Sequence, residues 1–268
     1  MKIPFTKAHG AKNDFLLTPA EAAPTADLAA VARAICDRHT GIGADGWYLV
    51  ERTGGAEYHA RVRLLNSDGS AAEVSGNGTR CAALWLIEAG AAESEVRILT
   101  GAGVKHLKLI GRDGPRFNFQ MGMGRIGWRD EDLRTSLVLR GGPCEVTILD
   151  VGNPQCAVFV EDFDFDWRSM GAELEHHARF PNRTNVSFVR PLDRHTVEAR
   201  FWERGAGETM SSGTGSTGAA AAAILRGVAD SPVRVVTPAG PLEIQGGDEY
   251  SMAGPAEIIA RGEYYYSE

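Results

Sequence analysis

Residues Ser75–Ala83 read S-G-N-G-T-R-C-A-A, and residues Ser212–Ala220 repeat the phrase as S-G-T-G-S-T-G-A-A. Each copy begins with a serine, places one polar residue between two glycines, and continues into an apolar run typical of a helix. The two serines lie 137 positions apart (212 − 75), about half of the 268-residue chain. The repeat predicts two similar halves whose loops face each other across a shared cleft, with one reactive side chain from each.

Polar residues outside the two loops repeat at nearly the same offset. Asn13 in G-A-K-N-D and Asn153 in V-G-N-P are 140 positions apart (153 − 13). Asn66 lies nine positions before the first serine, and Glu203 lies nine before the second. A chance match of one phrase would not bring such partners with it, so the sequence indicates a duplicated architecture.

The composition is that of an ordinary globular protein and excludes some classes of partner. Hydrophobic residues make up 43% of the chain and charged residues 24%, with a net charge of −7. That acidity argues against nucleic-acid or membrane binding, which favour basic patches. The sequence shows neither an 18-residue apolar stretch nor a signal-peptide core at its start, and its four cysteines form no C-x-x-C pair. We therefore expect a cytoplasmic protein with free thiols.

The hydrophobic pattern predicts a mixed α/β fold. We expect helices over 25–38, with Thr25 as N-cap and the segment Gly41–Gly43 beyond its end, and over 76–88, 167–177 and 213–226. Strands are expected near 2–7, 14–17, 46–52, 57–65, 95–99, 104–110, 116–120, 145–151, 156–161, 185–190, 196–203, 232–237, 242–246 and 256–264. The glycine-rich stretch 121–125 is the best candidate boundary, giving halves 1–120 and 121–256; a strand within 257–268 could pack with the first half.

The two loops have the chemistry of an anion site. Glycine and small polar residues at a helix start expose backbone N–H groups, and the helix dipole adds partial positive charge there. Glycine also lets a ligand approach without a Cβ in the way. Such loops suit a carboxylate, and could stabilise the charge that develops when the carbon beside a carboxylate loses its proton. The structural alternative is a pair of tight strand-to-helix turns.

Ser75 and Ser212 have two interpretations. Each directly precedes a glycine at a predicted helix start, where serine is a good N-cap. Each could instead transfer a proton to or from a substrate. Serine alone suits that task poorly, because a general base works best with a pKa near the working pH. A thiol, with a pKa of about 8.5, would be closer.

Two other motifs have weak support. Segments 41–46 and 213–218 match G-x-G-x-x-G, but the first follows a helix and too little chain follows the second for a nucleotide-binding sheet. Asp162, Asp164, Asp166 and Glu173 mimic calcium-loop spacing, but Trp167 stands where that loop needs glycine. We interpret these acids as helix-capping residues and expect no metal.

Together, eight segments resemble the diaminopimelate epimerase family, in the family's order and over nearly the whole chain. They are H-G-A-K-N-D-F (9–15), R-H-T-G-I-G-A-D-G (38–46), N-S-D-G-S (66–70), S-G-N-G-T-R-C (75–81), G-N-P-Q-C (152–156), R-T-N-V-S-F (183–188), E-R-G-A-G-E-T (203–209) and S-G-T-G (212–215). The resemblance implies two pseudo-symmetric α/β (α+β) domains, each a β-sheet or barrel wrapped around a central helix, with the active site in the cleft between them.

The resemblance also implies an activity. The family epimerises diaminopimelate from LL to meso without a cofactor, by removing a proton on one face and returning one on the other, in lysine and peptidoglycan precursor synthesis. The partner is thus a small amino-acid substrate, and a homodimer is compatible with the family. Two cysteines carry the protons in the family, and Ser75 and Ser212 stand at their positions.

Further roles are carried over by position. The residues that look like substrate contacts are Asn13, Asn66, Gly76, Asn77, Asn153, Asn185, Glu203, Arg204, Gly213 and Thr214. Glu208 and Gln155 are expected to support the catalytic groups. Gly76, Asn77, Gly213 and Thr214 form the carboxylate cradle that the loop chemistry also predicts.

The chain departs from the family at the reacting positions. Both proton-carrying cysteines are serine, Gln155 stands where the family has histidine, and Gly46 stands where it has glutamine. A histidine beside a thiol is a common activating pair, so losing both suggests that the proton relay changed as a unit. The alternatives are a homologue that binds an amino acid without turnover, or a different isomerase that uses Glu203 or Glu208 as base.

Overall fold

The computed structural model describes residues 1–25, 27–55 and 57–266. Contacts between residues divide the chain into two compact units. The first contains Met1–Met121 and the segment from Gly254 onward, and the second contains Gly122–Ala253. The division falls inside two strands rather than in linkers, because β8 (Arg116–Gly124) and β17 (Tyr250–Tyr265) each continue from one unit into the other. The glycine-rich stretch 121–125 is thus mostly strand.

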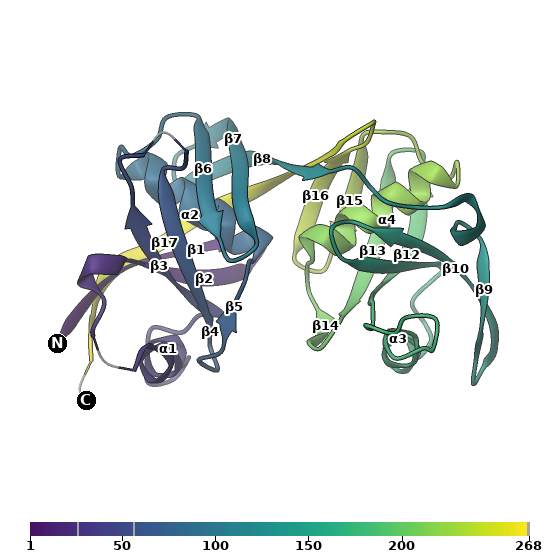
Figure 1. Ribbon diagram of the computed structural model, residues 1–268, viewed down its shortest axis with the longest axis horizontal. Coiled ribbons are helices and arrows are strands. Elements are labelled where there is room, and N and C mark those ends of the chain that lie inside the picture. The colour runs from purple at the N-terminus through teal and green to yellow at the C-terminus, as the bar shows by residue number, and fades with distance from the viewer. Residues whose placement is uncertain (26, 56, 267–268) are drawn as a thin grey trace. The chain divides into compact units, whose positions relative to one another are not determined.

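Strand pairing closes the first unit into an eight-stranded barrel (Figure 1). The order is β1, β2, β3, β4, β6, β7, β8 and β17, and β17 pairs back with β1 from Lys2↔Tyr265 to His9↔Glu257. The bounds are β1 (Lys2–Gly10), β2 (Asn13–Pro19), β3 (Gly46–Arg52), β4 (Ala60–Asn66), β5 (Ala71–Ala72), β6 (Glu95–Thr100) and β7 (Gly103–Asp113). Closure removes the free edges that an open sheet would expose.

The second unit repeats this order of pairings. A hairpin, a parallel pair, a second hairpin and a second parallel pair link β10, β11, β12, β13 and β15, as they link β1, β2, β3, β4 and β6. The bounds are β9 (Thr135–Leu139), β10 (Gly142–Asp150), β11 (Pro154–Phe159), β12 (Asn185–Asp193), β13 (Thr196–Glu203), β14 (Gly207–Thr209), β15 (Val233–Thr237) and β16 (Gly240–Gln245). The predicted duplication of secondary structure is confirmed.

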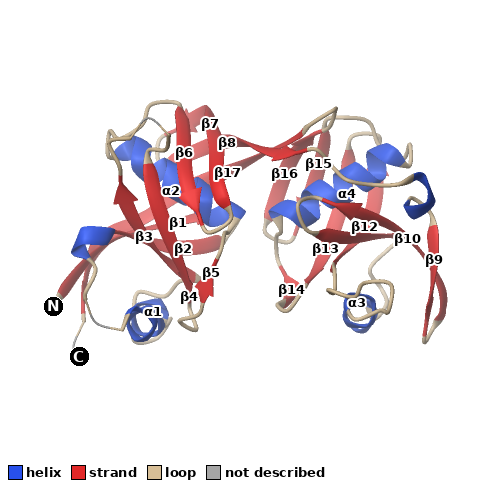
Figure 2. Ribbon diagram, in the orientation of Figure 1, coloured by secondary structure: helices blue, strands red, loops and turns tan. Residues whose placement is uncertain are grey.

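Each unit holds one helix among its strands (Figure 2). These are α2 (Gly76–Glu88) and α4 (Gly213–Leu225), which begin at the two repeated loops as predicted. Residues Ala219–Ala223 are fully buried on every side of α4. A helix that is apolar all round is stable only when surrounded, and its small alanines let strands pack closely against it. The mixed α/β class predicted from the pattern is confirmed.

The other two helices lie outside the strands and are shorter than predicted. α1 spans Leu28–Cys36, and its N-cap is Asp27, whose carboxylate accepts from the Ala29 N–H, rather than Thr25. The helix ends early because the Asp37 side chain accepts from the N–H groups of His39 and Thr40, forming a turn. α3 spans Trp167–Glu175, two residues short of the predicted end at 177.

Some elements lay outside the predictions. The short strands β5, β9 and β14 and the two 3₁₀ turns, Ala20–Ala22 and Asp130–Asp132, gave no usable periodicity. Several predicted strands are longer in the structure; β17 begins at Tyr250 rather than 256. Over the described residues, no helix combines the length and apolar character needed to cross a membrane. Cys36, Cys81, Cys144 and Cys156 are all free thiols.

Candidate active site

The two serines occupy the same local geometry at the start of their helices. Ser75 is the N-cap of α2, with φ −129° and ψ 123°, and its Oγ accepts from the Gly78 N–H at 3.2 Å. Ser212 is the N-cap of α4, with φ −135° and ψ 127°, and accepts from the Gly215 N–H at 3.1 Å. The interpretation of both serines as helix caps is confirmed. Capping leaves the oxygens at the positive ends of the helix dipoles.

The middle polar residue of each loop contacts an asparagine from the preceding hairpin. The Asn77 Nδ2 donates to Asn13 Oδ1 at 3.3 Å, and the Asn153 Nδ2 donates to the Thr214 hydroxyl at 3.4 Å. Each unit therefore brings together two of the predicted site residues that lie about 60 positions apart in sequence, 64 in the first unit and 61 in the second. Asn13 and Asn153 therefore recur at nearly the same separation as the two loops because each contacts the loop of its own unit.

Ser212 differs from Ser75 in its acidic partner. The Ser212 hydroxyl donates to Glu203 Oε1 at 2.6 Å, a short bond to a carboxylate at the end of β13. In the first unit the corresponding Asn66 donates instead to the Ser70 hydroxyl at 3.0 Å. Among the described residues no carboxylate hydrogen-bonds to the Ser75 hydroxyl. The two serines thus have equal geometry and unequal proton chemistry.

Glu208 was predicted to support Ser212, but in the structure its carboxylate binds another residue. Its two carboxylate oxygens accept from Arg168 Nε at 2.6 Å and Nη2 at 2.8 Å, a bidentate pair on the exposed surface. The reason is the alternation of side chains along paired strands. Glu208 lies opposite Trp202 in the β13–β14 ladder, while Glu203 lies opposite Gly207. Adjacent Trp202 and Glu203 point to opposite faces, so Glu208 shares the face of Trp202.

Asn185 and Arg204 hold the strand ends of the second unit. The buried Asn185 donates from Nδ2 to the Pro154 carbonyl at 3.0 Å and accepts at Oδ1 from the Arg204 backbone N–H at 3.0 Å. The exposed Arg204 side chain donates to the Asn182 carbonyl at 3.2 Å. Asn185 therefore fixes the backbone next to Glu203, and Arg204 has donors left for a ligand.

Gln155 lies beneath the second loop, only 2% exposed. Its Nε2 donates to Asn153 Oδ1 at 2.8 Å, so it orients the asparagine that contacts Thr214. Its side chain packs where a Cβ at Gly218 would stand, 3.2 Å from the Gln155 Cβ. Its Oε1 is buried and has no hydrogen-bond partner among the described residues. Gln155 thus acts on the loop through Asn153, and none of the hydrogen bonds described for Ser212 involves it.

Glycines in these loops serve the core as well as a ligand. A Cβ on Gly78 would stand 2.3 Å from a ring carbon of Tyr48, and one on Gly215 would stand 2.8 Å from the Phe201 ring. A Cβ on Gly46 would meet the Leu65 carbonyl oxygen at 2.9 Å. The second glycine of each loop is therefore required by packing against an aromatic ring, which the sequence argument from ligand access did not foresee.

Glu175, which the sequence did not single out, anchors the turn after Glu203. This buried carboxylate, at the C-terminal end of α3, accepts from the Trp202 indole N–H at 2.8 Å and from the Gly205 N–H at 2.9 Å, and pairs with Arg183 at 3.2 Å. Burial alone would raise the pKa of Glu175, but the Trp202 and Gly205 hydrogen bonds and the nearby His176 and Arg183 charges lower it overall. In the sequence, Glu175 is simply one acidic residue near the end of a polar predicted helix, and nothing there indicates its role.

The lowered pKa of Glu175 predicts a pH-dependent contribution to stability. Because the carboxylate is favoured in the folded state, its contribution is present above the unfolded pKa of about 4.3 and is lost as pH falls through the folded value. We expect Glu175→Gln to lower the unfolding free energy by about 1–2 kcal/mol at neutral pH, with the difference shrinking below about pH 4. Urea unfolding at both pH values measures this, with the exposed Glu161→Gln as control. A deficit that stays constant with pH would contradict the assignment.

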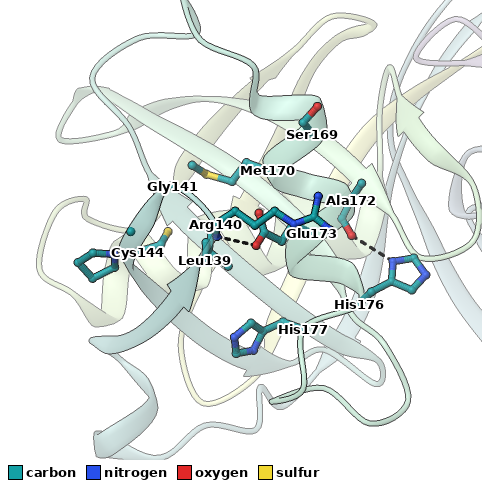
Figure 3. A pocket seen from close by; sticks show the side chains of 12 residues that line it. Leu139, Arg140, Gly141, Cys144, Ser169, Met170, Ala172, Glu173, His176 and His177 are labelled. Atoms are coloured by element: carbon teal, nitrogen blue, oxygen red, sulfur yellow. Dashed lines mark hydrogen bonds between the residues drawn. The ribbon is translucent and has the colours of Figure 1, made fainter.

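A cavity of about 890 Å³ in the second unit lies apart from the predicted residues (Figure 3). It is bounded by the β9–β10 hairpin and α3, with Leu139, Cys144, Met170 and His177 among its lining. Its polar groups pair locally: the Arg140 N–H donates to Glu173 at 2.7 Å, and His176 contacts the Ala172 carbonyl at 3.0 Å. None of the residues predicted to bind substrate lines this cavity.

The acids with calcium-loop spacing are used for local structure. Asp166 caps α3 by accepting from the Ser169 N–H at 3.1 Å, as the capping interpretation predicts. Asp162 accepts from the Asp164 N–H at 2.9 Å. In the part of the chain that the structure describes, no three metal-ligating side chains gather into a site.

Comparison with known proteins identifies relatives over nearly the whole chain. The family model described as diaminopimelate epimerase matches residues 5–126 and 147–259. A diaminopimelate epimerase of Pelotomaculum thermopropionicum is 37% identical over 98% of this chain and 99% of its own, and one of Moorella thermoacetica is 39% identical over 97% and 98%.

The fold also matches a solved structure at low sequence identity. A hydroxyproline epimerase from Agrobacterium vitis superposes with a TM-score of 0.67 at 15% identity, over 98% of this chain and 92% of that one. At that identity the likeness speaks for the fold alone. The family match and the curated relatives together support amino-acid epimerisation as the class of reaction. The chain belongs to the diaminopimelate epimerase family.

Proposed function

We propose that this protein epimerises diaminopimelate from the LL to the meso form by two proton transfers, without a cofactor. Family membership supports the substrate and the reaction class. The observation that carries the proposal for this chain is the matched pair of serine-capped helix starts, each tied to an asparagine through the middle residue of its loop.

In this proposal each unit contributes one proton-transfer group. Ser212 removes the α-proton as its own proton passes to Glu203, so that the C–H bond breaks, an O–H bond forms on the carboxylate, and the electron pair stays on the substrate. Ser75 gives its hydroxyl proton to the other face, where the electron pair forms the new C–H bond; the Ser75 oxygen then takes a proton from water and Glu203 gives one to water. The short Ser212–Glu203 bond supports the first step, because a hydroxyl on a carboxylate has a base within reach.

The remaining site residues bind and orient the substrate in this proposal. Backbone N–H groups at Gly76, Asn77, Gly213 and Thr214 hold carboxylate and stabilise the charge that spreads into it when the proton leaves. Polar contacts to the amino and distal groups come from Asn13, Asn66, Asn153, Asn185, Glu203 and Arg204. The free thiols, three of them buried, fit the reducing cytoplasm in which lysine and peptidoglycan precursors would be made.

The test is proton exchange and inversion with the purified protein. LL-diaminopimelate in deuterated water should acquire deuterium at one α-carbon and convert to the meso form, followed by NMR and chiral chromatography. The control is Ser136→Ala, an exposed serine on β9. Binding of diaminopimelate without exchange would overturn the proposal in favour of a non-catalytic homologue.

A second candidate is favoured by the inequality of the two serines. With a carboxylate on Ser212 and none on Ser75, the site resembles a single acid–base centre more than a symmetric pair. A different isomerase, which moves a proton between two carbons of a carboxylate substrate on one face, would need only Glu203. A panel of unsaturated and hydroxy carboxylic acids distinguishes it, because exchange with one of these and none with diaminopimelate would favour the second candidate.

A further inference from the structure

The first unit contains a fully buried arginine behind its loop. Arg80, in the first turns of α2, has none of its surface exposed. Its Nη2 donates to Asn77 Oδ1 at 2.6 Å, its Nη1 to the Gly76 carbonyl at 3.4 Å, and its Nε to the Pro255 carbonyl at 3.1 Å. The guanidinium therefore contacts the two residues that directly follow Ser75.

No carboxylate among the described residues pairs with Arg80. All three described partners are neutral oxygens. Burial lowers the pKa of Arg80 to about 10, so the guanidinium remains charged at neutral pH. A buried charge without a counter-ion is costly, and an arrangement of this kind is stabilised when an anion arrives nearby. Arg80 thus adds a full positive charge to the partial charge of the helix end.

The second unit has no such charge at the corresponding place. Counting from the loop serines, Arg80 matches Thr217, which is buried and donates its hydroxyl to the Gly213 carbonyl at 2.9 Å. The second loop instead has the Glu203 carboxylate beside it, at 2.6 Å from Ser212. One helix start therefore combines the dipole with a buried cation, and the other combines it with an anion.

We propose that Arg80 is a positioning residue that strengthens carboxylate binding at the α2 helix start. It acts through Asn77 and Gly76, whose atoms it orients, and through its uncompensated charge. The anion that it attracts is the substrate carboxylate, a group that the proposed function supplies, and the N–H groups of Gly76 and Asn77 hold it.

The experiment replaces Asn77 by a built-in counter-ion. Asn77→Asp keeps Oδ1 on Arg80 and gives the guanidinium a carboxylate of its own, while it loses the hydrogen bond that the Asn77 Nδ2 donates to Asn13 Oδ1. Pimelate, which has the two carboxylates and length of diaminopimelate but no amines, is the probe. We expect pimelate to raise the melting temperature of the wild-type protein and to bind Asn77→Asp at least tenfold more weakly by calorimetry. 1,5-Diaminopentane, which has no carboxylate, should not bind through this loop in either protein.

Variants of the arginine separate charge from structure. Arg80→Lys keeps the charge and should retain most pimelate affinity, whereas Arg80→Met should lose it; Arg61→Met, on the exposed face of β4, is the control. Equal pimelate affinity in the wild type and Asn77→Asp, or no pimelate binding by the wild type, overturns the inference whether or not diaminopimelate is epimerised. Pimelate binding that Arg80→Met abolishes and Arg80→Lys retains, in a protein that inverts no diaminopimelate, sustains the inference and rejects the proposed function.

Discussion

The double variant Ser75→Cys/Ser212→Cys is expected to epimerise diaminopimelate at least about a hundredfold faster than the wild-type protein. A well-placed general acid or base contributes about 10²–10⁴ to a rate, and a thiol with a pKa of about 8.5 is far closer to neutral pH than a hydroxyl. The side chains already cap α2 and α4 in equal geometry, so the larger sulfur needs no new positioning. Helix N-termini also lower thiol pKa values.

The two single variants should not be equivalent. A thiol at position 212 would lie against the Glu203 carboxylate, and a neighbouring negative charge disfavours the thiolate. A thiol at position 75 would have no such neighbour among the described residues. Iodoacetamide alkylation as a function of pH should therefore modify Ser75→Cys at lower pH than Ser212→Cys. Ser169→Cys, at an exposed position, serves as the matched thiol control.

The rate of deuterium incorporation at the α-carbon measures the effect directly. A double variant that turns over no faster than the wild type would mean that these serines do not carry the protons. The duplicated loops would then be structural caps, and the reaction would have to be sought elsewhere in each unit.

Gly78→Ala is expected to lower the unfolding free energy by about 1–3 kcal/mol, the usual cost of overpacking a core. Helix propensity predicts the opposite sign, because alanine in a helix is favoured over glycine by about 1 kcal/mol. The new Cβ would stand 2.3 Å from the Tyr48 ring and 2.6 Å from its hydroxyl oxygen. Tyr48 is 1% exposed and donates to the Ser75 carbonyl at 3.4 Å, so it has little room to move.

A thermal scan or urea titration distinguishes the two signs. For a protein of this size the loss corresponds to a fall of several degrees in Tm. Gly54→Ala is the control, because no heavy atom lies within 4 Å of a Cβ there and its effect should be small. An unchanged or raised Tm for Gly78→Ala would mean that α2 can shift away from Tyr48, and that packing does not fix the first loop. If Gly78→Ala then loses epimerase activity, the cause would be that the new Cβ hinders the approach of the ligand to the loop.

The internal duplication could be predicted from the sequence because similar residue types recur at a nearly constant separation along the chain. The two serine–glycine loops predicted where α2 and α4 begin, and the strands with clear apolar patterns were found within a few residues. Local competition by side chains was harder to foresee. Asp27 rather than Thr25 caps α1, and the Asp37 turn ends it early, because short acids bond to nearby N–H groups.

The partners of the site residues required the folded chain. Glu203 and Glu208 are both acids close to Ser212 in sequence, and composition gives no reason to prefer one. The β13–β14 register decides between them, since side chains alternate across a strand and put Glu203 with Ser212 and Glu208 with Arg168. The contacts of Asn13 with Asn77 and of Asn153 with Thr214 likewise depend on hairpins packing beside a helix start.

Residue types and their spacing along the chain are enough to predict the duplication, the element order and a serine positioned to cap each of the two central helices. The electrostatic difference between the two loops arises in the fold, which buries Arg80 behind the first loop and places Glu203 in a hydrogen bond with the serine of the second. A charge acts through space, so its effect depends on its burial and on its nearest partner, and the order of residues alone gives neither.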